Sequence, residues 1–375
     1  MGKDKLKMKN YDTIVVGAGI AGCCSAFFLK QRGLKVLVLD RAGVASMGGS
    51  SAAGAFVSPK IGKGSPLQDL TNEAFEFAKD FYMRYFPEHF YQTGVIRMPK
   101  DREDADKFDI YEKYNSSKRE WITQSELKEM GLKNSQDSFL FHEAGVCDAQ
   151  QMCKAILRGI DYKQYEVKEL LRKDEYWEIG GSRAKYLILA TGYENNLCDM
   201  RYMGVRGTWG SRGDYITDLD LSVSMHKQIS ISANIDGVIK IGATHNKSKE
   251  PCISCDGKPL KKLFETASTM VDTDDFRLKE TFCGMRSGSK DYFPLLGEVI
   301  DVPYMLDNYP KIVRGQRVKE FKKIENLYIC NGVGGRGFVF APIMGKILAD
   351  SIVDGVEVDV RFNPDRLFLK WCRKL

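Results

Sequence analysis

Three glycines near the start of the chain have the spacing of a dinucleotide-binding turn. Gly17, Gly19 and Gly22 form the pattern G-x-G-x-x-G, and Asp40 closes the next apolar run. In such a turn the first glycine permits the tight bend, the second lets a pyrophosphate approach the backbone, and the third packs a helix on a strand. The amino end of that helix favours negative charge, and Asp40 is expected to accept hydrogen bonds from ribose hydroxyls. The residues expected here are Gly17, Ala18, Gly19, Ile20, Ala21, Gly22, Asp40 and Arg41.

Two arginines late in the chain are candidates for binding an anionic substrate. Arg286 lies in G-M-R-S-G-S-K-D-Y-F-P-L-L-G at 284–297, and Arg336 lies in N-G-V-G-G-R-G-F at 331–338. The planar guanidinium of arginine can meet both oxygens of a carboxylate and stays charged at any working pH. Arg286 is the leading candidate, with a structural salt bridge as its alternative. Arg336 either faces a bound ligand or caps a helix and bridges two parts of the fold.

The segments around these residues alternate between strand and helix patterns. The β-branched run at 11–19 ends in glycines, residues 20–32 are compatible with a helix, and 35–39 form a second apolar strand, which together predict a βαβ unit. Residues 67–91 carry aromatic side chains at helical spacing. Further strands are expected at 185–192 and 327–330, followed by a long helix near 341–351.

These patterns predict an α/β protein in which a Rossmann-type domain is interleaved with an α+β substrate domain. Residues 206–325 contain short strands separated by turns, so the substrate domain is expected to be built on a mainly antiparallel sheet. The Rossmann-type domain is expected over 10–58, 145–205 and 325–375, and the substrate domain over 59–144 and 206–324. A chain of 375 residues is long enough for two such lobes.

Composition narrows the class of protein. Apolar residues make up 43% of the chain and charged residues 28%, which is ordinary for a globular protein. No run approaches the roughly 18 apolar residues of a membrane-spanning helix, and the basic, polar start lacks the apolar stretch of a signal peptide, so a cytoplasmic location is expected. Most of the 10 cysteines are expected to be reduced thiols. Cys252 and Cys255 form an isolated C-x-x-C, interpreted as a loop with two thiols rather than a metal or redox site.

The glycine-rich motifs together resemble the D-amino-acid-oxidase superfamily of flavoproteins. The resemblance is carried by V-V-G-A-G-I-A-G at 15–22, A-T-G at 190–192, N-G-V-G-G-R-G-F at 331–338, and R-x-x-x-x-D-x-x-P-x-x-G at 286–297. It implies FAD bound on a glutathione-reductase-like Rossmann-type domain, and oxidation of a C–N bond next to a carboxylate that Arg286 binds. It assigns to FAD, besides the residues above, Gly49, Ser50, Ser51, Ala53, Gly54, Val167 (on a strand), Ala190, Thr191, Gly192, Gly334, Gly335, Arg336, Gly337 and Phe338.

Such a reaction requires neither a protein nucleophile nor a metal. A neutral amine would pass hydride from its α carbon to the flavin, and the protein would supply alignment and electrostatics. The catalytic candidates are therefore Arg286 and Arg336, and no metal site is expected. The four histidines are interpreted as structural, and His245 is the one that merits a test as a base.

Within that superfamily, four features resemble the FAD-dependent half of bifunctional enzymes that modify the tRNA wobble uridine. They are V-R-G at 205–207, I-G-A-T at 241–244, R-G-F at 336–338, and N-P-D-R-L-F-L-K-W-C-R-K-L at 363–375. The resemblance implies removal of the carboxymethyl group from carboxymethylaminomethyl-(2-thio)uridine, with release of glyoxylate. The methyltransferase half of those enzymes has no counterpart in these 375 residues, and a tyrosine often found on the substrate sheet is missing, with Ser230 or Ser232 near its place.

A tRNA partner predicts a basic surface around the mouth of the pocket. Two groups of residues are candidates for it: Lys311, Arg314, Arg317, Lys319, Lys322 and Lys323, and Arg366, Lys370, Arg373 and Lys374. One alternative function is a small-molecule amine or amino-acid oxidase or dehydrogenase acting on glycine, sarcosine or a D-amino acid, which needs no such surface. Another is a flavin-containing binding protein with a degenerate site, against which an intact Arg286 argues.

Overall fold

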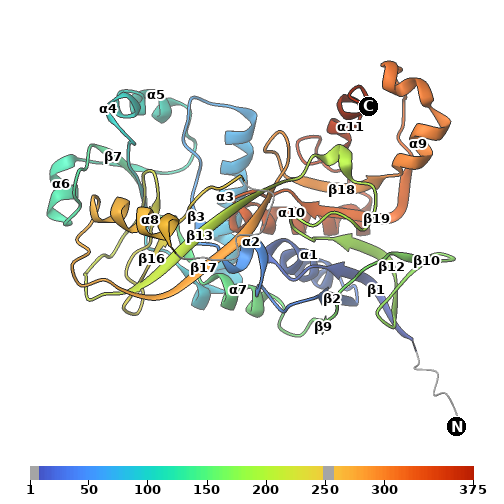
Figure 1. Ribbon diagram of the computed structural model, residues 1–375, viewed down its shortest axis with the longest axis horizontal. Helices are drawn as coiled ribbons and strands as arrows, with labels where there is room; N and C mark the ends of the chain where they lie inside the picture. The colour runs from blue at the N-terminus through green and yellow to red at the C-terminus, as the bar shows by residue number, and fades with distance from the viewer. Residues whose placement is uncertain (1–7, 248–256) are drawn as a thin grey trace, which may run out of the picture.

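The computed structural model describes residues 8–247 and 257–375, which form two lobes that meet along long strands and central helices (Figure 1). One lobe is built on an eight-stranded sheet with the order β10-β11-β12-β1-β2-β9, to which β19 and β18 are added through β12. Its strands are β1 (Lys9–Val16), β2 (Val36–Asp40), β9 (Asp161–Gln164), β10 (Leu171–Lys173), β11 (Tyr176–Ile179), β12 (Ser182–Leu189), β18 (Leu295–Ile300) and β19 (Lys323–Asn331).

The centre of this sheet is parallel, as the βαβ pattern predicts. β1 runs parallel to both β12 and β2, β12 runs parallel to β19, and β2 runs parallel to β9. The short apolar strands are buried, which is typical of parallel strands covered on both faces. Their carboxyl ends meet at one edge, so the turns that follow β1, β12 and β19 come together there.

The second large sheet is mainly antiparallel. Its order is β17-β13-β16-β15-β14-β5-β7-β6, and only β14 and β5 run parallel among the pairs described. The strands are β5 (Val95–Arg97), β6 (Glu120–Ile122), β7 (Ser138–Phe141), β13 (Arg206–Ile216), β14 (Ser224–His226), β15 (Ser230–Ile231), β16 (Val238–Gly242) and β17 (Arg277–Gly288). A small third sheet contains β3 (Phe56–Val57), β4 (Phe90–Tyr91) and β8 (Gly145–Cys147). The predicted fold class is therefore confirmed.

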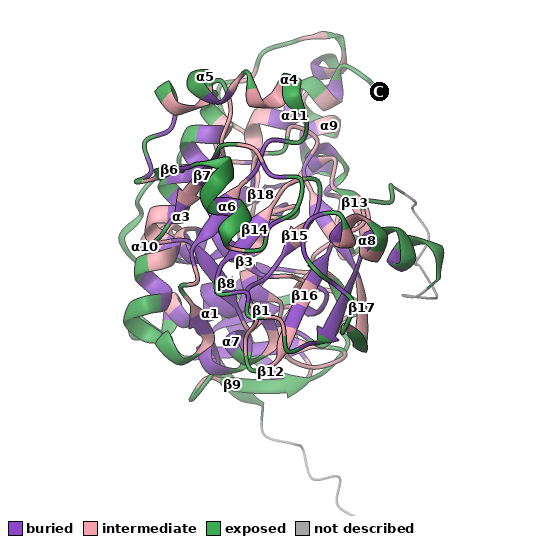
Figure 2. Ribbon diagram, turned by 90° about the vertical axis from the view of Figure 1, so that its left-hand side faces the viewer, coloured by how far each residue is buried: buried purple, intermediate pink, exposed green. Residues whose placement is uncertain are grey.

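Helices pack against the first sheet and join the lobes. α1, α3 and α10 contact one another. The ring of Phe81 on α3 packs edge-on against the ring of Phe27 on α1, with 5.3 Å between the ring centroids. The elements at the centre of the molecule consist mostly of buried residues, whereas the short outer helices are largely exposed (Figure 2). The helices are α1 (Ile20–Gln31), α2 (Gly48–Ser51), α3 (Pro66–Tyr85), α4 (Arg102–Ala105), α5 (Phe108–Lys113), α6 (Gln124–Glu129), α7 (Ala149–Ile156), α8 (Lys258–Ser268), α9 (Val302–Asn308), α10 (Gly337–Asp354) and α11 (Asp365–Cys372).

Three local expectations need correction. The aromatic helix ends at Tyr85 rather than at 91, because Pro87 lacks the amide that would continue it. The long late helix begins directly at the glycine turn, at Gly337. Val167 is not on a strand, since β9 ends at Gln164 and the charged residues after it follow no strand pattern.

The positions of the cysteines and of β18 complete the description. Seven described cysteines are free thiols, six of them buried, whereas Cys283 is disulfide-bonded. Cys252 and Cys255 lie outside the described residues.

β18 falls within 206–324, the range expected for the substrate domain, yet it pairs with β19 in the first sheet. The division of the chain into domains stays a prediction.

None of the helices in residues 8–247 and 257–375 has both the length and the apolar character to cross a membrane.

Candidate active site

A cavity of about 1370 Å³ is lined by residues from both large sheets, α2 and the start of α10. This volume exceeds the roughly 300–1,000 Å³ of a typical small-ligand site, so the cavity has room for a large cofactor together with a substrate. The structure brings together in its wall these residues predicted from the sequence: Gly17, Gly19, Ile20, Ala21, Asp40, Arg41, Gly49, Ser50, Ser51, Ala53, Gly54, Val167, Ala190, Thr191, Gly192, Arg286, Gly334, Gly335, Arg336, Gly337 and Phe338. Ala18 and Gly22 do not line it.

The glycine turn after β1 is shaped by close backbone packing. Gly17 has φ +110°, and a Cβ on it would overlap the carbonyl of Ala190 at the end of β12. A Cβ on Gly22 would overlap the Gly17 carbonyl, so Gly22 acts in packing behind the cavity. Gly19 gives α1 no side-chain cap, so the first-turn amides other than that of Ile20 are left for an acceptor such as a phosphate.

The segment that follows β2 completes this end of the cavity. Ser50 on α2 accepts a hydrogen bond from the Ile20 amide at 3.0 Å. Asp40 accepts from the Ala18 amide at 2.8 Å and from the Ala42 amide at 2.9 Å, so its carboxylate is fixed at the carboxyl end of β2. These residues fit the ribose and pyrophosphate of a dinucleotide in their chemistry.

Arg41 has a partner within the protein. Its guanidinium forms a bidentate ion pair with Glu194, at 2.7 and 2.6 Å, and both side chains are substantially exposed. The pair links the end of β2 to the loop after β12. Arg41 therefore lines the cavity as part of a surface ion pair.

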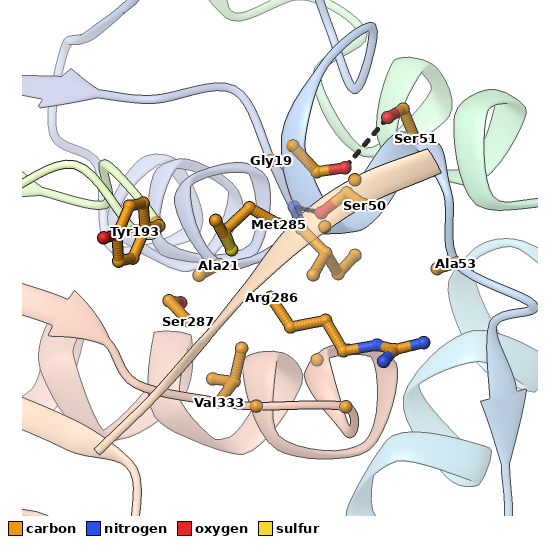
Figure 3. Close-up of a pocket in the computed structure, with 18 of the residues that line it drawn as sticks. Gly19, Ala21, Ser50, Ser51, Ala53, Tyr193, Met285, Arg286, Ser287 and Val333 are labelled. Atoms are coloured by element: carbon orange, nitrogen blue, oxygen red, sulfur yellow. Dashed lines mark hydrogen bonds between the residues drawn. The ribbon is translucent and has the colours of Figure 1, made fainter. Parts of the chain in front are cut away.

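Arg286 projects from β17, and its guanidinium points away from Tyr193 (Figure 3). Its Nη1 donates to the carbonyl of Thr244 at 3.1 Å. A Cβ on Gly210, in the neighbouring strand β13, would overlap this guanidinium, so the glycine makes room for it. Burial lowers the pKa of Arg286, and it forms no ion pair with any residue that the structure describes. The arginine thus presents a partly buried positive charge to the cavity without a carboxylate partner among these residues.

The glycine turn before α10 is tied to the strand that carries Arg286. The Gly334 amide donates to the Ser287 carbonyl at 2.7 Å. Arg336 is the first residue before α10 and gives the helix no side-chain cap. Instead its Nη1 donates to the Ser58 carbonyl at 3.3 Å, and its side chain faces the cavity. Arg336 therefore bridges to the segment after β3 as well as lining the cavity.

Three residues that the sequence did not single out as site residues join Arg336 in the cavity wall. They are Lys60, Arg97 and His226. Burial and the charge of Arg336 lower the pKa of Arg97 to about 9, and burial lowers that of Arg336 to about 10. The pKa of His226 lies well below its ordinary value because of burial and then Arg97 and Arg336, so this histidine is neutral at pH 7.

His245, the histidine singled out for a test as a base, also lines the cavity. Its pKa is lowered first by burial and then by the charge of Arg286. His245 is therefore held neutral near Arg286, a protonation state in which an imidazole can accept a proton.

Two more cationic side chains in the wall have partners. Arg212 pairs with Asp214 at 2.8 Å, donates to the Ala53 carbonyl and lies over the ring of Phe282. Lys240 reaches the Cys147 carbonyl at 3.4 Å, and burial followed by the charge of Arg212 lowers its pKa. Arg212 is thereby neutralised, and it anchors the segment after α2 to the second sheet.

Comparisons with known proteins identify the family and the fold. The sequence matches the family described as FAD dependent oxidoreductase over residues 12–351. Among curated proteins it is similar to the tRNA 5-methylaminomethyl-2-thiouridine biosynthesis bifunctional protein MnmC of Idiomarina loihiensis, with 25% identity over 90% of this chain and 55% of that protein. It is also similar to MnmC of Legionella pneumophila, with 22% identity over 90% of this chain and 54% of that protein. The chain thus spans about half the length of the curated relatives it matches.

Solved structures share the fold. Glycine oxidase from Bacillus cereus superposes with a TM-score of 0.77 at 19% identity, covering 92% of this chain and 96% of that one. Iminodiacetate oxidase from a Chelativorans species gives a TM-score of 0.75 at 17% identity, covering 94% and 98%. The family match, the shared fold and the glycine turns that suit a dinucleotide lead to one conclusion: this chain belongs to the FAD-dependent oxidoreductase family and is an enzyme with FAD as its cofactor.

Proposed function

We propose that this enzyme oxidises the C–N bond of an N-carboxymethyl amine, and that its substrate is the carboxymethylaminomethyl group of the wobble uridine in tRNA. The observation that carries the proposal is Arg286, a partly buried guanidinium in the cavity wall that has no carboxylate partner among the described residues. A partly desolvated charge without a partner favours an anionic ligand.

The chain's own residues have defined tasks in this reaction. Bound FAD supplies the acceptor for a hydride from the carbon between the amine and the carboxylate. Arg286 holds the carboxylate through paired hydrogen bonds and so fixes that carbon in the cavity. The positive charge of Arg286 also disfavours protonation of the amine, which must have its lone pair free to form the imine. The amine proton is released to water as the imine forms, and water then hydrolyses the imine to glyoxylate and an aminomethyl group.

A separate basic pocket supports tRNA as the partner. We call it the basic pocket, a depression of about 210 Å³ lined by Arg201, Tyr202, Gly204, Arg206, Lys290, Leu367, Lys370 and Trp371. Lys374, Lys370 and Arg206 all lower the pKa of Lys290, which shows that these positive charges lie close together. Lys290 and Tyr292 are on the same β17–β18 loop, and Tyr292 lines the large cavity. A phosphate backbone bound at the basic pocket would therefore be joined through this short loop to the wall of the large cavity, in which a flipped-out base would bind.

Not every basic residue predicted for tRNA contact is available. Arg366 is enclosed by Asp291 and by four backbone carbonyls, and Lys323 pairs with Asp365. These two are engaged inside the fold because they stand where α11 docks on the first sheet. Lys370, Arg373 and Lys374 are exposed, as are Lys311, Arg314, Arg317, Lys319 and Lys322.

The decisive experiment is anaerobic reduction of the bound flavin. Purified yellow protein is mixed with tRNA bearing carboxymethylaminomethyl-uridine, or with glycine, sarcosine or D-alanine, and the flavin absorbance is followed. Bleaching by the tRNA, with glyoxylate formed in equal amount, is the expected result. Bleaching by a free amino acid but not by the tRNA would instead establish a small-molecule oxidase, and a colourless protein that takes up no FAD would refute both functions.

A further inference from the structure

Three cationic side chains gather in one part of the cavity wall. We call Lys60, Arg97 and Arg336 the inner cation group. Lys60 follows β3, Arg97 is the last residue of β5, and Arg336 directly precedes α10, so three distant segments converge here. His226 on β14 stands opposite Arg97 in the parallel pair of strands. The convergence is therefore built by the fold of both lobes.

None of the members of the inner cation group forms an ion pair among the described residues, and the described carboxylates that line the cavity are Asp40, Glu166 and Glu194, at or after the ends of β2, β9 and β12. Asp104 is the acid whose charge acts on Arg97; it does not line the cavity, and it also accepts from the Lys100 amide and the Tyr111 hydroxyl. A single carboxylate outside the cavity wall therefore stands against three positive charges. The hydroxyl of Ser230 hydrogen-bonds His226 at 2.7 Å, and this neutral histidine adds no compensating charge.

The positive charges of the inner cation group repel one another. Burial lowers the pKa of Lys60, and the charges of Arg336, Arg97 and Lys100 lower it further. Placing partly buried cations close together without an ion-pair partner opposes folding, and a bound anion would offset that cost. The group differs from Arg286 in its contacts, because Nη1 of Arg336 donates to the Ser58 carbonyl whereas Nη1 of Arg286 donates to the Thr244 carbonyl.

We propose that Lys60, Arg97 and Arg336 form a second carboxylate subsite, distinct from Arg286. Two planar guanidinium groups and one ammonium match the geometry of a carboxylate, and the first turn of α1 offers its own place for the FAD phosphates. The choice of a carboxylate rests on the proposed function, which yields glyoxylate in this cavity. The carboxylate comes either from a second acidic group on the same substrate or from a small free anion such as that product.

Binding to the oxidised holoenzyme tests the subsite without turnover. The flavin spectrum is titrated with diglycolate, a dicarboxylate in which an ether oxygen replaces the amine, and with methoxyacetate, the matching monocarboxylate. We expect Lys60→Met and Arg97→Met each to weaken the binding of at least one of these two ligands by tenfold or more, and Arg97→Lys to restore part of that affinity. The control is Lys63→Met, because Lys63 is exposed on the same loop as Lys60 and does not line the cavity. This substitution should leave the affinity for both ligands unchanged.

The two ligands distinguish the source of the carboxylate. If one molecule spans both subsites, diglycolate binds more tightly than methoxyacetate and loses affinity in Arg286→Met as well. If the subsite takes a free anion, methoxyacetate loses affinity in Lys60→Met and Arg97→Met but not in Arg286→Met. Unchanged affinity for both ligands in Lys60→Met and Arg97→Met, or binding of inorganic phosphate in place of either carboxylate, would overturn the proposal.

Thermal unfolding supplies a readout that a purely structural lysine would not give. Because Lys60 adds to an unbalanced charge, Lys60→Met should raise Tm in the absence of anions and remove the rise in Tm that diglycolate produces in the wild type. A lower Tm in the variant, with the diglycolate effect retained, would assign Lys60 to the structure alone. These binding and unfolding measurements remain informative even if tRNA proves not to be the substrate.

Discussion

Arg286 and Thr244 are joined across the second sheet by a hydrogen bond in which Nη1 of the arginine donates to the threonine carbonyl at 3.1 Å. The bond holds one edge of the guanidinium against the segment after β16. The remaining nitrogens stay available to the cavity, since no residue that the structure describes forms an ion pair with them. This leaves a planar pair of donors fixed in direction, which is what bidentate binding of a carboxylate requires.

Replacing Arg286 by alanine should therefore impair the substrate and not the cofactor. Loss of hydrogen bonds to a charged group removes about 1.5–3 kcal/mol, which corresponds to roughly 10- to 100-fold weaker substrate binding. Anaerobic stopped-flow reduction with the compound that bleaches the wild-type flavin measures this, and FAD content should stay at the wild-type level. Arg84→Ala, an exposed arginine on α3, serves as the control. Unchanged reduction kinetics in Arg286→Ala would remove the role assigned to this arginine.

Gly210→Ala should disturb the same contact while leaving Arg286 in place. The new methyl group would overlap the guanidinium, so the arginine must move off the Thr244 carbonyl. We expect a rise in KM larger than any fall in kcat, because the carboxylate is held less well. Gly288→Ala on β17, the strand that pairs with β13, is the matched control, since its Cβ would lie 3.9 Å from Gly334, an ordinary contact. Equal effects of the two substitutions would mean that the loss is a general one of packing between β13 and β17.

The basic pocket should control affinity for tRNA without affecting chemistry on small amines. Lys290→Met and Lys374→Met remove two neighbouring positive charges, and each lost phosphate contact should reduce the slope of log affinity against log salt by about 1. Filter binding at several salt concentrations measures the slope. Lys154→Met on the exposed side of α7 should leave it unchanged. An unaltered slope in the double variant would place the tRNA elsewhere on the surface.

The sequence predicted the residues that line one end of the cavity because they belong to local motifs. The glycine turn, the strand that Asp40 closes and the turn before α10 each occupy a few consecutive residues, and all lie at the carboxyl ends of parallel strands. The inner cation group was not predicted because Lys60 and Arg97 carry no local pattern and come to the cavity wall from segments of two different sheets. The prediction of a strand at Val167 rests on its position in the sequence alone. The prediction that Arg366 belongs to a surface patch misses its ion pair, because its partner Asp291 is remote in sequence.

Asp291 explains why the signature around Arg286 contains an acid five residues further on. It pairs with Arg366 of α11 through both carboxylate oxygens, at 2.9 and 3.0 Å, and so fixes the loop that carries Lys290 and Tyr292. Burial alone would raise the pKa of Asp291, but hydrogen bonds and the charge of Arg366, with help from Ser289, outweigh it and hold the pKa below its ordinary value.

Because the pKa is depressed in the folded state, the pair contributes stability above the unfolded-state pKa of about 3.9, and this contribution is lost as the pH falls through the lower folded-state value. We expect Asp291→Asn to lower the free energy of unfolding at pH 7 by no more than about 1 kcal/mol, since the carboxylate is partly exposed, and to have little effect near pH 3. Urea unfolding at both pH values, with Asp274→Asn in an exposed turn as the control, measures the difference. A deficit of the same size at both pH values would show that Asp291 acts through packing rather than through its charge.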